Sequence, residues 1–351
     1  MMNKNPRLEQ ALELMGKQAP IYQPTSFWAT ASQRIVDELH QYGVSKFRQL
    51  PAALNFFVPN YGVPASGLSA VQVDSLTDSL KNHFPQATKA QLALDHWTSG
   101  RLSALADYRV LLASKHTHDL PNLMKFSESQ VGDPSEQWTW DEKRYSRSAL
   151  NYLLGLSFLK HHLDGDVPRK VLEIGGGFGT LGEIWSQTEI ENWQYIDIDI
   201  PPTQFAADYY LKQALGDNLV TGFDDIASQG SVDISTLKPA SVLCSWQIEQ
   251  LQGTIDLFVN FISFQEMEPD VVQNYLNHVD RLKSRWILLR NMREGKQKKR
   301  QGHAGVTIPI KTDDYLAMLP NYTLVDRNVH PFGYETVDGF HSELMLFKRK
   351  S

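Results

Sequence analysis

The segment from Val171 to Trp185, VLEIGGGFGTLGEIW, constrains the fold more than any other part of the chain. A short apolar run is followed by closely spaced glycines, and then by Leu181, Ile184 and Trp185 at helical spacing. Glycine is needed where a turn takes backbone angles that a Cβ would strain, or where a ligand lies directly on the main chain. We therefore expect a strand, a tight ligand-binding turn and a helix.

After a linker at residues 164–170, short apolar runs alternate with amphipathic segments, which predicts βα units and a parallel sheet. The last two of the expected strands have no helical pattern between them, so we expect them to pair antiparallel or to lie apart. A seven-stranded sheet that ends in this way is typical of class I methyltransferases. The expected strands are Val171–Ile174, Gln194–Asp199, Val242–Ser245, Asp256–Ile262, Arg285–Arg290, Thr323–Arg327 and Leu344–Lys348.

Helices are expected on either side of this change in rhythm. One starts near Pro269, and another near Thr312, which we expect to be its N-cap. Upstream, Leu150, Leu153, Leu154 and Phe158 form one apolar stripe that is expected to pack on the domain that follows. Further upstream we expect helices at Ser26–Tyr42, Leu68–His83 and Ala90–Ser114.

The chain is long enough for two domains. We expect a helical N-terminal region at 1–165, with a role as a cap, in substrate binding or in oligomerisation, and a cofactor-binding α/β domain at 166–351 with a Rossmann-like sheet. The protein is expected to form homo-oligomers or to act as a monomer, since the sequence leaves this open.

Composition excludes several classes of protein. The net charge of -6 argues against a general nucleic-acid binder, which needs a basic face. Cys244 is the only cysteine, so the chain forms no intrachain disulfide and no thiolate zinc cluster. We find no apolar run long enough for a signal peptide or a membrane span, and we expect a soluble, cytoplasmic protein.

The turn itself has the spacing GxGxG, with an acidic residue two positions before the first glycine. A carboxylate about 20 residues after such a turn can accept hydrogen bonds from both hydroxyls of a ribose. Asp197 and Asp199 lie at that distance, and we favour Asp199 because it stands at the end of its strand. The other cofactor contacts predicted at the turn are Glu173, Gly175, Gly176, Gly177 and Gly179.

A dinucleotide is the main alternative, because Gly177, Gly179 and Gly182 also satisfy GxGxxG. Two features of the turn favour S-adenosylmethionine (SAM) over a nicotinamide or flavin nucleotide. Glu173 suits a cofactor with a cationic amino group and would repel a pyrophosphate. The glycines also start at Gly175, which is early for the dinucleotide register. A merely structural turn is the third interpretation.

Taken together, these segments resemble the family of sugar O-methyltransferases from bacterial surface-polysaccharide and sialic-acid-type loci. The resemblance covers roughly residues 120 to 351, and its most specific string is SFQEM. It implies a class I fold, SAM as methyl donor and a hydroxyl of a nucleotide-sugar or glycan as acceptor. The match rests on VLEIGGGFGTLGEIW, YIDIDIPP (195–202), DLFVNFISFQEMEP (256–269), LLRNMREGKQ (288–297), VGDPSE (131–136), Tyr145 and Ser146.

Ligands of an open α/β sheet bind outside the carboxyl ends of its strands, which selects residues 263–268, 290–308 and 328–343. Methylation of an alcohol releases a proton, so a general base is useful. The candidates there are Glu266, His303 and His341, with His330 less favoured. A role in capping the helix near Pro269 is the alternative for Glu266, and a surface or structural role is the alternative for each histidine.

The basic run from Arg290 to Arg300 is either a solvated loop or a lid that recognises phosphate or carboxylate. Trp138, Trp140 and Tyr145 either stack on a sugar ring or belong to the core. No metal-ligand spacing is found, although a divalent cation remains open. The predicted substrate contacts are Gln265, Arg290, Arg293, Lys296, Tyr145 and Ser146. The candidates for adenine are Asp224, Asp225, Ser245, Trp246 and Gln247, with the last three preferred because they follow a strand end.

Overall fold

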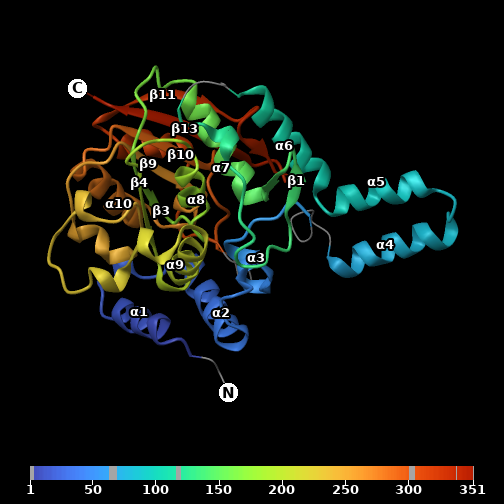
Figure 1. Ribbon diagram of the computed structural model, residues 1–351, viewed down its shortest axis with the longest axis horizontal. Coiled ribbons are helices and arrows are strands. Elements are labelled where there is room, and N and C mark those ends of the chain that lie inside the picture. The colour runs from blue at the N-terminus through green and yellow to red at the C-terminus, as the bar shows by residue number, and fades with distance from the viewer. Residues whose placement is uncertain (1–3, 63–68, 116–119, 300–304, 337, 351) are drawn as a thin grey trace.

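A nine-stranded sheet forms the centre of the structure, a computed structural model that describes residues 4–62, 69–115, 120–299, 305–336 and 338–350 (Figure 1). Eight strands follow one another in the order β11-β13-β10-β9-β3-β4-β7-β5, and β12 pairs with β13. The bounds are β3 Lys170–Ile174, β4 Gln194–Asp199, β5 Val220–Gly222, β7 Ala240–Cys244, β9 Leu257–Phe261, β10 Trp286–Met292, β11 Tyr322–Asn328, β12 Tyr334–Glu335 and β13 His341–Arg349.

The sheet confirms the predicted fold class. All seven expected strands are present, and β13 lies antiparallel between β10 and β11, while β5, β7, β4, β3, β9 and β10 run parallel. Without β5 and β12, the strand order is that of class I methyltransferases. The expected number of strands is wrong by two, because β5 has three residues and β12 has two, and runs this short carry no recognisable period.

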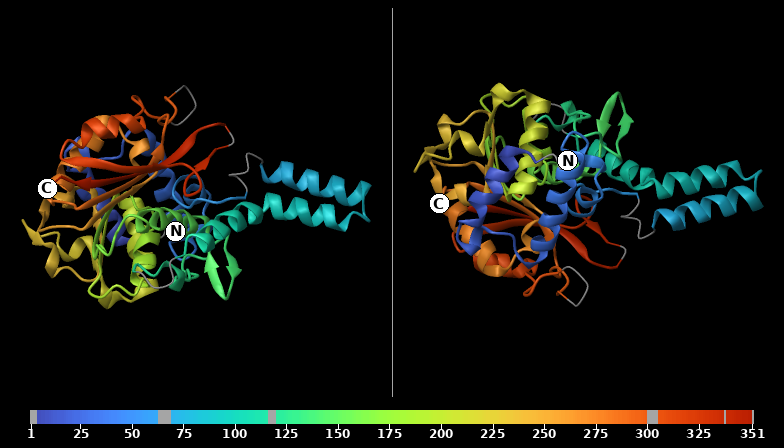
Figure 2. Two further views of the ribbon diagram at one scale, coloured as in Figure 1. Left: turned by 90° about the horizontal axis from the view of Figure 1, so that it is seen from above. Right: turned by 90° about the horizontal axis from the view of Figure 1, so that it is seen from below.

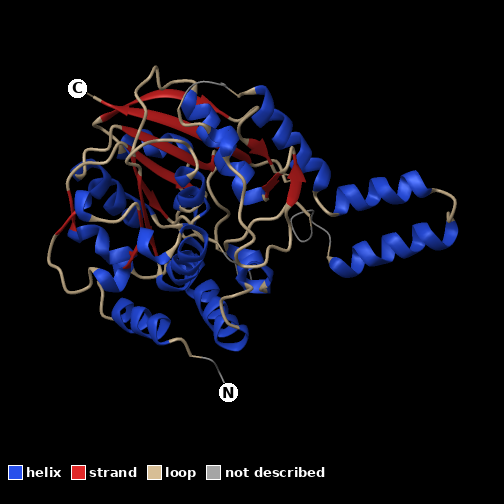
Figure 3. Cartoon of the chain, viewed as in Figure 1, coloured by secondary structure: helices blue, strands red, loops and turns tan. Residues whose placement is uncertain are grey.

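Helices cover both faces of the sheet (Figure 3). Neighbouring residues of β3 point to opposite faces, so Val171 belongs to one apolar cluster and Leu172 to the other. One cluster includes α7 (Arg147–Lys160), α8 (Thr180–Ser186) and α9 (Pro201–Leu215). The other includes α10 (Pro269–Arg281) and α11 (Thr312–Met318). Buried on both faces, the central strands are mainly apolar, as parallel strands are, with Glu173 in β3 and Asn260 in β9 as buried polar residues.

Both predicted helices of the C-terminal half are present. The helix expected near Pro269 is α10, which begins at that residue. The expectation that Thr312 caps the next helix is wrong by one residue. The N-cap is Lys311, and its amide donates to the side chain of Asp314 at 2.8 Å.

The N-terminal region is mainly helical. Helix α2 has the expected bounds, but the single helix expected at Ala90–Ser114 is two helices, because Gly100 takes a left-handed φ of 81° between them. Helices α4 and α5 extend away from the sheet as an arm (Figures 1 and 2). The elements are α1 Pro6–Gly16, α2 Ser26–Tyr42, α3 Pro51–Phe56, α4 Ala70–His83, α5 Thr88–Thr98, α6 Arg101–Ala113, β1 Trp138–Trp140 and β2 Lys143–Tyr145.

Helix α7 joins the N-terminal region to the sheet. Its predicted stripe of Leu150, Leu153, Leu154 and Phe158 is buried. At Gly155 the helix lies so close to the sheet that an added Cβ would come within 2.3 Å of the ring of Phe261. The division predicted at residue 165 therefore falls between two parts that share one core. None of the described helices has the length and apolar character needed to cross a membrane.

The remaining elements are short. Strands β6 (Val232–Asp233) and β8 (Leu251–Gln252) pair with each other outside the main sheet. The 3-10 helices are η1 Pro20–Tyr22, η2 Phe47–Gln49, η3 Leu123–Lys125, η4 Asp217–Leu219, η5 Phe223–Asp225, η6 Ile234–Thr236, η7 Ser245–Gln250 and η8 Phe264–Glu266.

Candidate functional site

A cavity of about 480 Å³ opens at the carboxyl edge of β3, β4, β9 and β10. This is where an open α/β sheet binds its ligands. Three parts of the N-terminal region complete the cavity wall. They are the segment before α2, helix α3 and the first turns of α7. Its walls include Gly175–Gly177, Asp199, Ile200, Ser263, Gln265, Glu266, Met292, Lys296, Gln23, Trp28, Phe57, Asn60, Arg147, Ser148, Asn151 and Tyr334.

Each of the three glycines in the turn after β3 has different surroundings at the place where a side chain would begin. A Cβ on Gly175 would come within 1.9 Å of the Oγ atom of Ser263. A Cβ on Gly176 would come within 2.8 Å of the carboxylate oxygens of both Asp197 and Glu173. At Gly177, where φ is +66°, the first atom that a Cβ would meet is the carbonyl oxygen of Phe57 at 3.4 Å. Gly177 thus leaves room on the cavity side of the turn.

The two acids of β4 differ in their access to the cavity. The Oδ2 atom of Asp199 accepts the amide of Gly177 at 3.2 Å, and its Oδ1 atom accepts the amide of Ile200 at 2.7 Å. Asp199 lines the cavity, and burial raises the pKa of its carboxyl to about 6. Asp197 is fully buried and accepts the amide of Gly176 at 3.2 Å. Its side chain is absent from the cavity wall, and burial raises its pKa well above the ordinary value.

Glu173 lies beneath the glycine turn, and its side chain is not part of the cavity wall. The hydroxyls of Tyr152 and Tyr195 each donate to its carboxylate at 2.6 Å. Burial raises the pKa of Glu173 to about 7. Gly179, the last predicted glycine contact, is the N-cap of α8, lies against Leu211 and is also outside the wall. Glu173, Asp197 and Asp199 therefore lie together below the glycine turn, and of these only Asp199 lines the cavity.

On the other side of the cavity, Glu266 and Lys296 form an ion pair of 2.8 Å between Oε1 and Nζ. Burial raises the pKa of Glu266, and Lys296 opposes this shift. The ammonium also lies 4.8 Å from the ring centroid of Phe27 in α2. Gln265 lies in the wall, and its Oε1 atom accepts the amide of Met292 at 2.7 Å.

Two other basic residues of the predicted loop, Arg290 and Arg293, are not part of the cavity wall. Arg290 is fully buried, lies 4.9 Å from the ring centroid of Phe261 and donates to the carbonyl of Phe332. Arg293 pairs with Glu343 at 3.0 Å. Neither side chain is part of the wall, because each is turned toward a partner on another part of the sheet.

Neither His330 nor His341 is part of the cavity wall, so neither places a base there. The Nδ1 atom of His341 lies 2.7 Å from the Oε1 atom of Glu294, at the start of β13 and outside the wall. His330 is exposed before Pro331. His303 and Arg300 lie outside the described residues.

Tyr145 and Ser146 lie next to the cavity but not in its wall. The Tyr145 ring packs against Tyr108 at 5.1 Å between centroids, within a cluster that also holds Trp138 and Trp140. Ser146 is the N-cap of α7 and donates to Glu128 at 2.7 Å. These aromatic rings therefore pack in the core, and the wall instead receives the next two residues, Arg147 and Ser148.

The favoured adenine contacts are turned away from the cavity. Ser245 donates to the carbonyl of Tyr22 at 2.7 Å, and Gln247 donates to the carbonyl of Phe223 at 2.9 Å. Trp246 packs against the apolar clusters below α1 and α10. None of the three lines the cavity.

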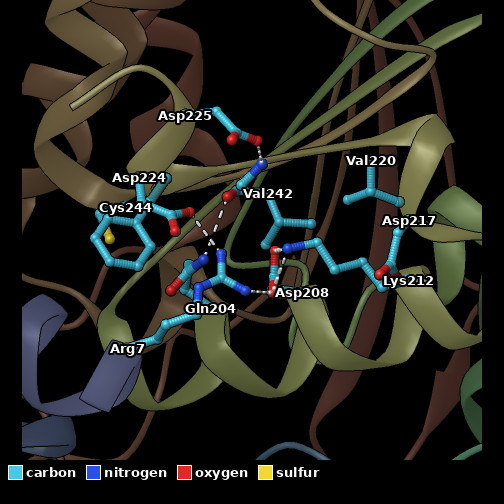
Figure 4. A network of polar contacts seen from close by, with 12 residues as sticks. Arg7, Gln204, Asp208, Lys212, Asp217, Val220, Asp224, Asp225, Val242 and Cys244 are labelled. Atoms are coloured by element: carbon cyan, nitrogen blue, oxygen red, sulfur yellow. Dashed lines mark hydrogen bonds and ion pairs between the residues drawn. The ribbon is translucent and has the colours of Figure 1, made fainter. Parts of the chain in front are cut away.

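Asp224 and Asp225 are also held by other groups. The guanidinium of Arg7 lies between Asp208 and Asp224, at 2.7 and 2.6 Å, and thereby holds α1 against α9 and η5 (Figure 4). Asp225 accepts the amide of Gly222 at 2.8 Å. Next to Asp199, the cavity wall is formed instead by Ile200, Thr203, Val271 and Tyr275.

Sequence reasoning missed the part of the wall that comes from residues before Val171. Trp28, Phe57, Asn60 and Asn151 have irregular spacing and belong to separate elements, so only the tertiary fold brings them together. One signal was available for α7. The N-cap at Ser146 sets the helical phase in which Arg147 and Asn151 share a face. Among the described residues, no group of three or more His, Cys, Asp and Glu is placed to hold a metal ion.

Comparison with known proteins found no matching family model and no matching curated protein. Several solved structures match about half of the chain. Magnesium protoporphyrin IX methyltransferase from Synechocystis PCC 6803 with bound SAH has 13% identity and a TM-score of 0.37, over 57% of this chain and 81% of that chain. The 1,6-didemethyltoxoflavin-N1-methyltransferase from Burkholderia thailandensis has 16% identity and a TM-score of 0.38, over 56% and 77%. A SAM dependent methyltransferase from Aquifex aeolicus has 15% identity and a TM-score of 0.31, over 50% and 80%.

Proposed function

We propose that this chain is a SAM-dependent O-methyltransferase whose acceptor is a hydroxyl of a sugar, in a nucleotide-sugar or a glycan. One observation carries the proposal. A single cavity holds both a bare glycine turn with Asp199 beside it and, on its other side, the buried pair of Glu266 and Lys296. The first feature suits a donor cofactor, and the second suits the removal of a proton.

The donor half fits SAM in shape and charge. Gly177 leaves open the space that a side chain would fill, and Asp199 presents a carboxylate to accept both ribose hydroxyls. Ile200 and Tyr275 offer apolar surface for the adenine ring. The acids around the turn favour a cation rather than a pyrophosphate. When bound there, SAM supplies a methyl group on a sulfonium sulfur. The thioether formed on transfer is a good leaving group and needs no metal to activate it.

In the acceptor half, Glu266 is the group that takes the proton of the hydroxyl. Burial holds its pKa above the ordinary value, which moves it toward the range of an effective general base at neutral pH. Lys296 holds the carboxylate in one position and keeps it ionised before the proton arrives. The proton then resides on an oxygen of Glu266, close to the ammonium.

The lining of the acceptor half supports a sugar. Asn60 and Asn151 line this half, and an amide side chain can both donate and accept, as hydroxyl groups require, although the nitrogen of Asn60 already donates to the carbonyl of Val58 at 3.2 Å. Trp28 adds an aromatic surface on which the apolar face of a sugar ring can lie. Polar side chains beside an aromatic ring therefore favour a polyhydroxylated acceptor over a purely apolar one.

Calorimetry and a transfer assay test this function. We expect the purified protein to bind SAM and S-adenosylhomocysteine (SAH) with measurable heat, and to show no heat with NAD. With labelled SAM, we expect methyl transfer to a member of a panel of nucleotide-sugars and glycans. A product methylated on nitrogen would move the assignment to an amine acceptor. Absence of heat for both SAM and SAH would refute the assignment altogether.

A further inference from the structure

The cavity wall contains a cation that the proposed chemistry has not used. Arg147, the first residue of α7, lines the acceptor half. Its guanidinium lies 5.3 Å from the ring centroid of Tyr61 and 5.6 Å from that of Tyr334. It donates to the carbonyl of Asn60 through Nη1, while its Nε atom is buried without a hydrogen-bond partner.

Arg147 has no direct ion pair with a carboxylate of the described residues, and Glu136 favours its charge only from a greater distance. The neighbouring acids are held by other donors. Asp107 accepts the hydroxyl of Tyr61, and Glu136 accepts the amides of Tyr61 and Gly62 at 2.8 and 2.9 Å. Lys296 differs in this respect, because it forms a direct ion pair with Glu266. Tyr334, Tyr61 and Glu136 favour the charged guanidinium, but none of the neighbouring carboxylates forms a direct ion pair with it, so an anionic ligand group can take that place.

The contact of Arg147 with Tyr334 bears on whether its guanidinium faces the acceptor or the donor. Its neighbour Tyr334 belongs to β12, which pairs with β13. Strands β10 and β9 separate β13 from β3, the strand that carries the glycine turn. Neighbouring strands lie about 4.8 Å apart, so β13 lies roughly 14 Å from β3. The guanidinium therefore extends from the start of α7, where Ser148 lies 2.8 Å from Thr180 of α8, toward Tyr334 of β12.

Building on the proposed function, we infer that Arg147 binds an anionic group of the acceptor, either a carboxylate or a phosphate. The planar guanidinium suits two parallel hydrogen bonds to either anion. The rings of Tyr61 and Tyr334 fix its orientation before the ligand arrives. The acceptor is thus an acidic sugar or a phosphorylated sugar, and a neutral sugar is a poor ligand.

A binding experiment on the full chain saturated with SAH tests this inference. Glucuronate, glucose 1-phosphate and glucose are titrated against the wild type, and their dissociation constants are measured by ligand-observed NMR. We expect at least one acid to bind about 10- to 100-fold more tightly than glucose, as one charge-assisted contact allows. Whichever of glucuronate and glucose 1-phosphate binds more tightly identifies the anion as a carboxylate or a phosphate. Equal binding of all three ligands would overturn the inference.

The variant Arg147→Gln should remove this preference, so that the acids bind no more tightly than glucose does to the same variant. Arg147→Lys, which keeps the charge but loses the planar fork, should restore part of it. Arg109→Gln is the matched control, because Arg109 is exposed on α6 and is not part of the wall. A preference for acids that persists in Arg147→Gln would refute the role of this residue. Melting temperatures show whether the variants are folded.

The carboxylate of the cofactor is the competing source of the anion. SAH carries that carboxylate and 5′-methylthioadenosine does not, so the two ligands separate the sources. We expect Arg147→Gln to bind both as the wild type does. A loss of SAH affinity of tenfold or more, with 5′-methylthioadenosine unaffected, would assign Arg147 to the donor and overturn the inference.

This test does not depend on turnover. A wild type that binds acids through Arg147 but methylates no sugar would refute the proposed function and leave the anion site standing. A wild type that methylates a neutral sugar, at a rate that Arg147→Gln does not change, would refute the anion site and leave the proposed function standing.

Discussion

The backbone amide of Gly177 donates to the Oδ2 atom of Asp199 at 3.2 Å, so the glycine turn and the end of β4 hold each other in place. The second oxygen of Asp199 accepts the amide of Ile200 at 2.7 Å, which fixes the plane of the carboxylate. The donor half of the cavity is thus ordered by contacts within the chain. Such preorganisation lowers the entropy lost when a ligand binds, and it makes the effects of single substitutions easy to interpret.

Gly177→Val should abolish binding of SAH while the chain stays folded. The Cβ has 3.4 Å of clearance from Phe57, so the branched side chain occupies the donor space without displacing the backbone. The left-handed φ of +66° costs about 1 to 2 kcal/mol with a side chain present. Calorimetry with SAH and thermal unfolding measure the two effects. Gly165→Val is the control, because Gly165 has a φ of +82° in open space away from the cavity.

Asp199→Asn should weaken the binding of SAH by about 10- to 100-fold, because an amide accepts hydroxyl hydrogen bonds less strongly than a carboxylate. Asp197→Asn is the matched substitution two residues earlier in the same strand. Asp197 is fully buried, its pKa is raised well above the ordinary value, and it is absent from the cavity wall, so its replacement by an amide should leave the affinity unchanged. Equal losses in the two variants, measured by calorimetry, would contradict the assignment of Asp199.

The strand ends of the donor half could be predicted because local signals coincide there. Three spaced glycines after an apolar run indicate a turn, and Asp199 stands directly before a proline-rich helix start. The preference for Asp199 over Asp197 rested on position along the strand, because the two side chains point to the same face and only Asp199 stands at the carboxyl end of β4. The seven main strands and α10 could be predicted for similar reasons, because their periods are long enough to recognise.

The adenine side could not be predicted, because residues distant in sequence compete for the same groups. Ser245 follows a strand end, as expected, but Tyr22 of η1 supplies its partner from the other end of the chain. Asp224 is bound by Arg7 in the same way (Figure 4). Tyr145 is not part of the cavity wall, whereas Arg147, which follows the N-cap at Ser146, lines it. Periodicity describes one element at a time and carries no information on such contacts.

The acids below the glycine turn predict how stability and affinity change with pH. Burial raises the pKa of Asp199 from 3.8 to about 6 and that of Glu173 from 4.5 to about 7. The folded chain therefore retains protons that the unfolded chain has released, so these groups favour folding at about pH 4 and lose that contribution as pH rises through 6 and 7. Thermal unfolding without ligand should show a falling melting temperature across this window.

Binding of SAM should follow the opposite trend over the same window, because a sulfonium favours the ionised acids. We expect the affinity for SAM to rise between about pH 5 and 7.5, and to rise less in Asp199→Asn, which lacks one of the titrating groups. Calorimetry at several pH values measures both slopes. An affinity for SAM that falls with pH would contradict the proposed environment of the cation.

Glu266→Gln should lower kcat for methyl transfer by about 10²- to 10⁴-fold, which is the usual contribution of a general base. Because Glu266 lies on the acceptor side, the variant should bind SAH as the wild type does.

Lys296→Met then tests whether the ion pair sets the pKa of Glu266. Lys296 lowers the pKa of Glu266, so its removal raises that pKa and moves the acid limb of the pH profile of kcat to higher pH. Lys298→Met removes an equal charge from an exposed side chain two residues away and should leave the profile in place. An acid limb that does not move in Lys296→Met would show that the group titrating in the reaction is not Glu266.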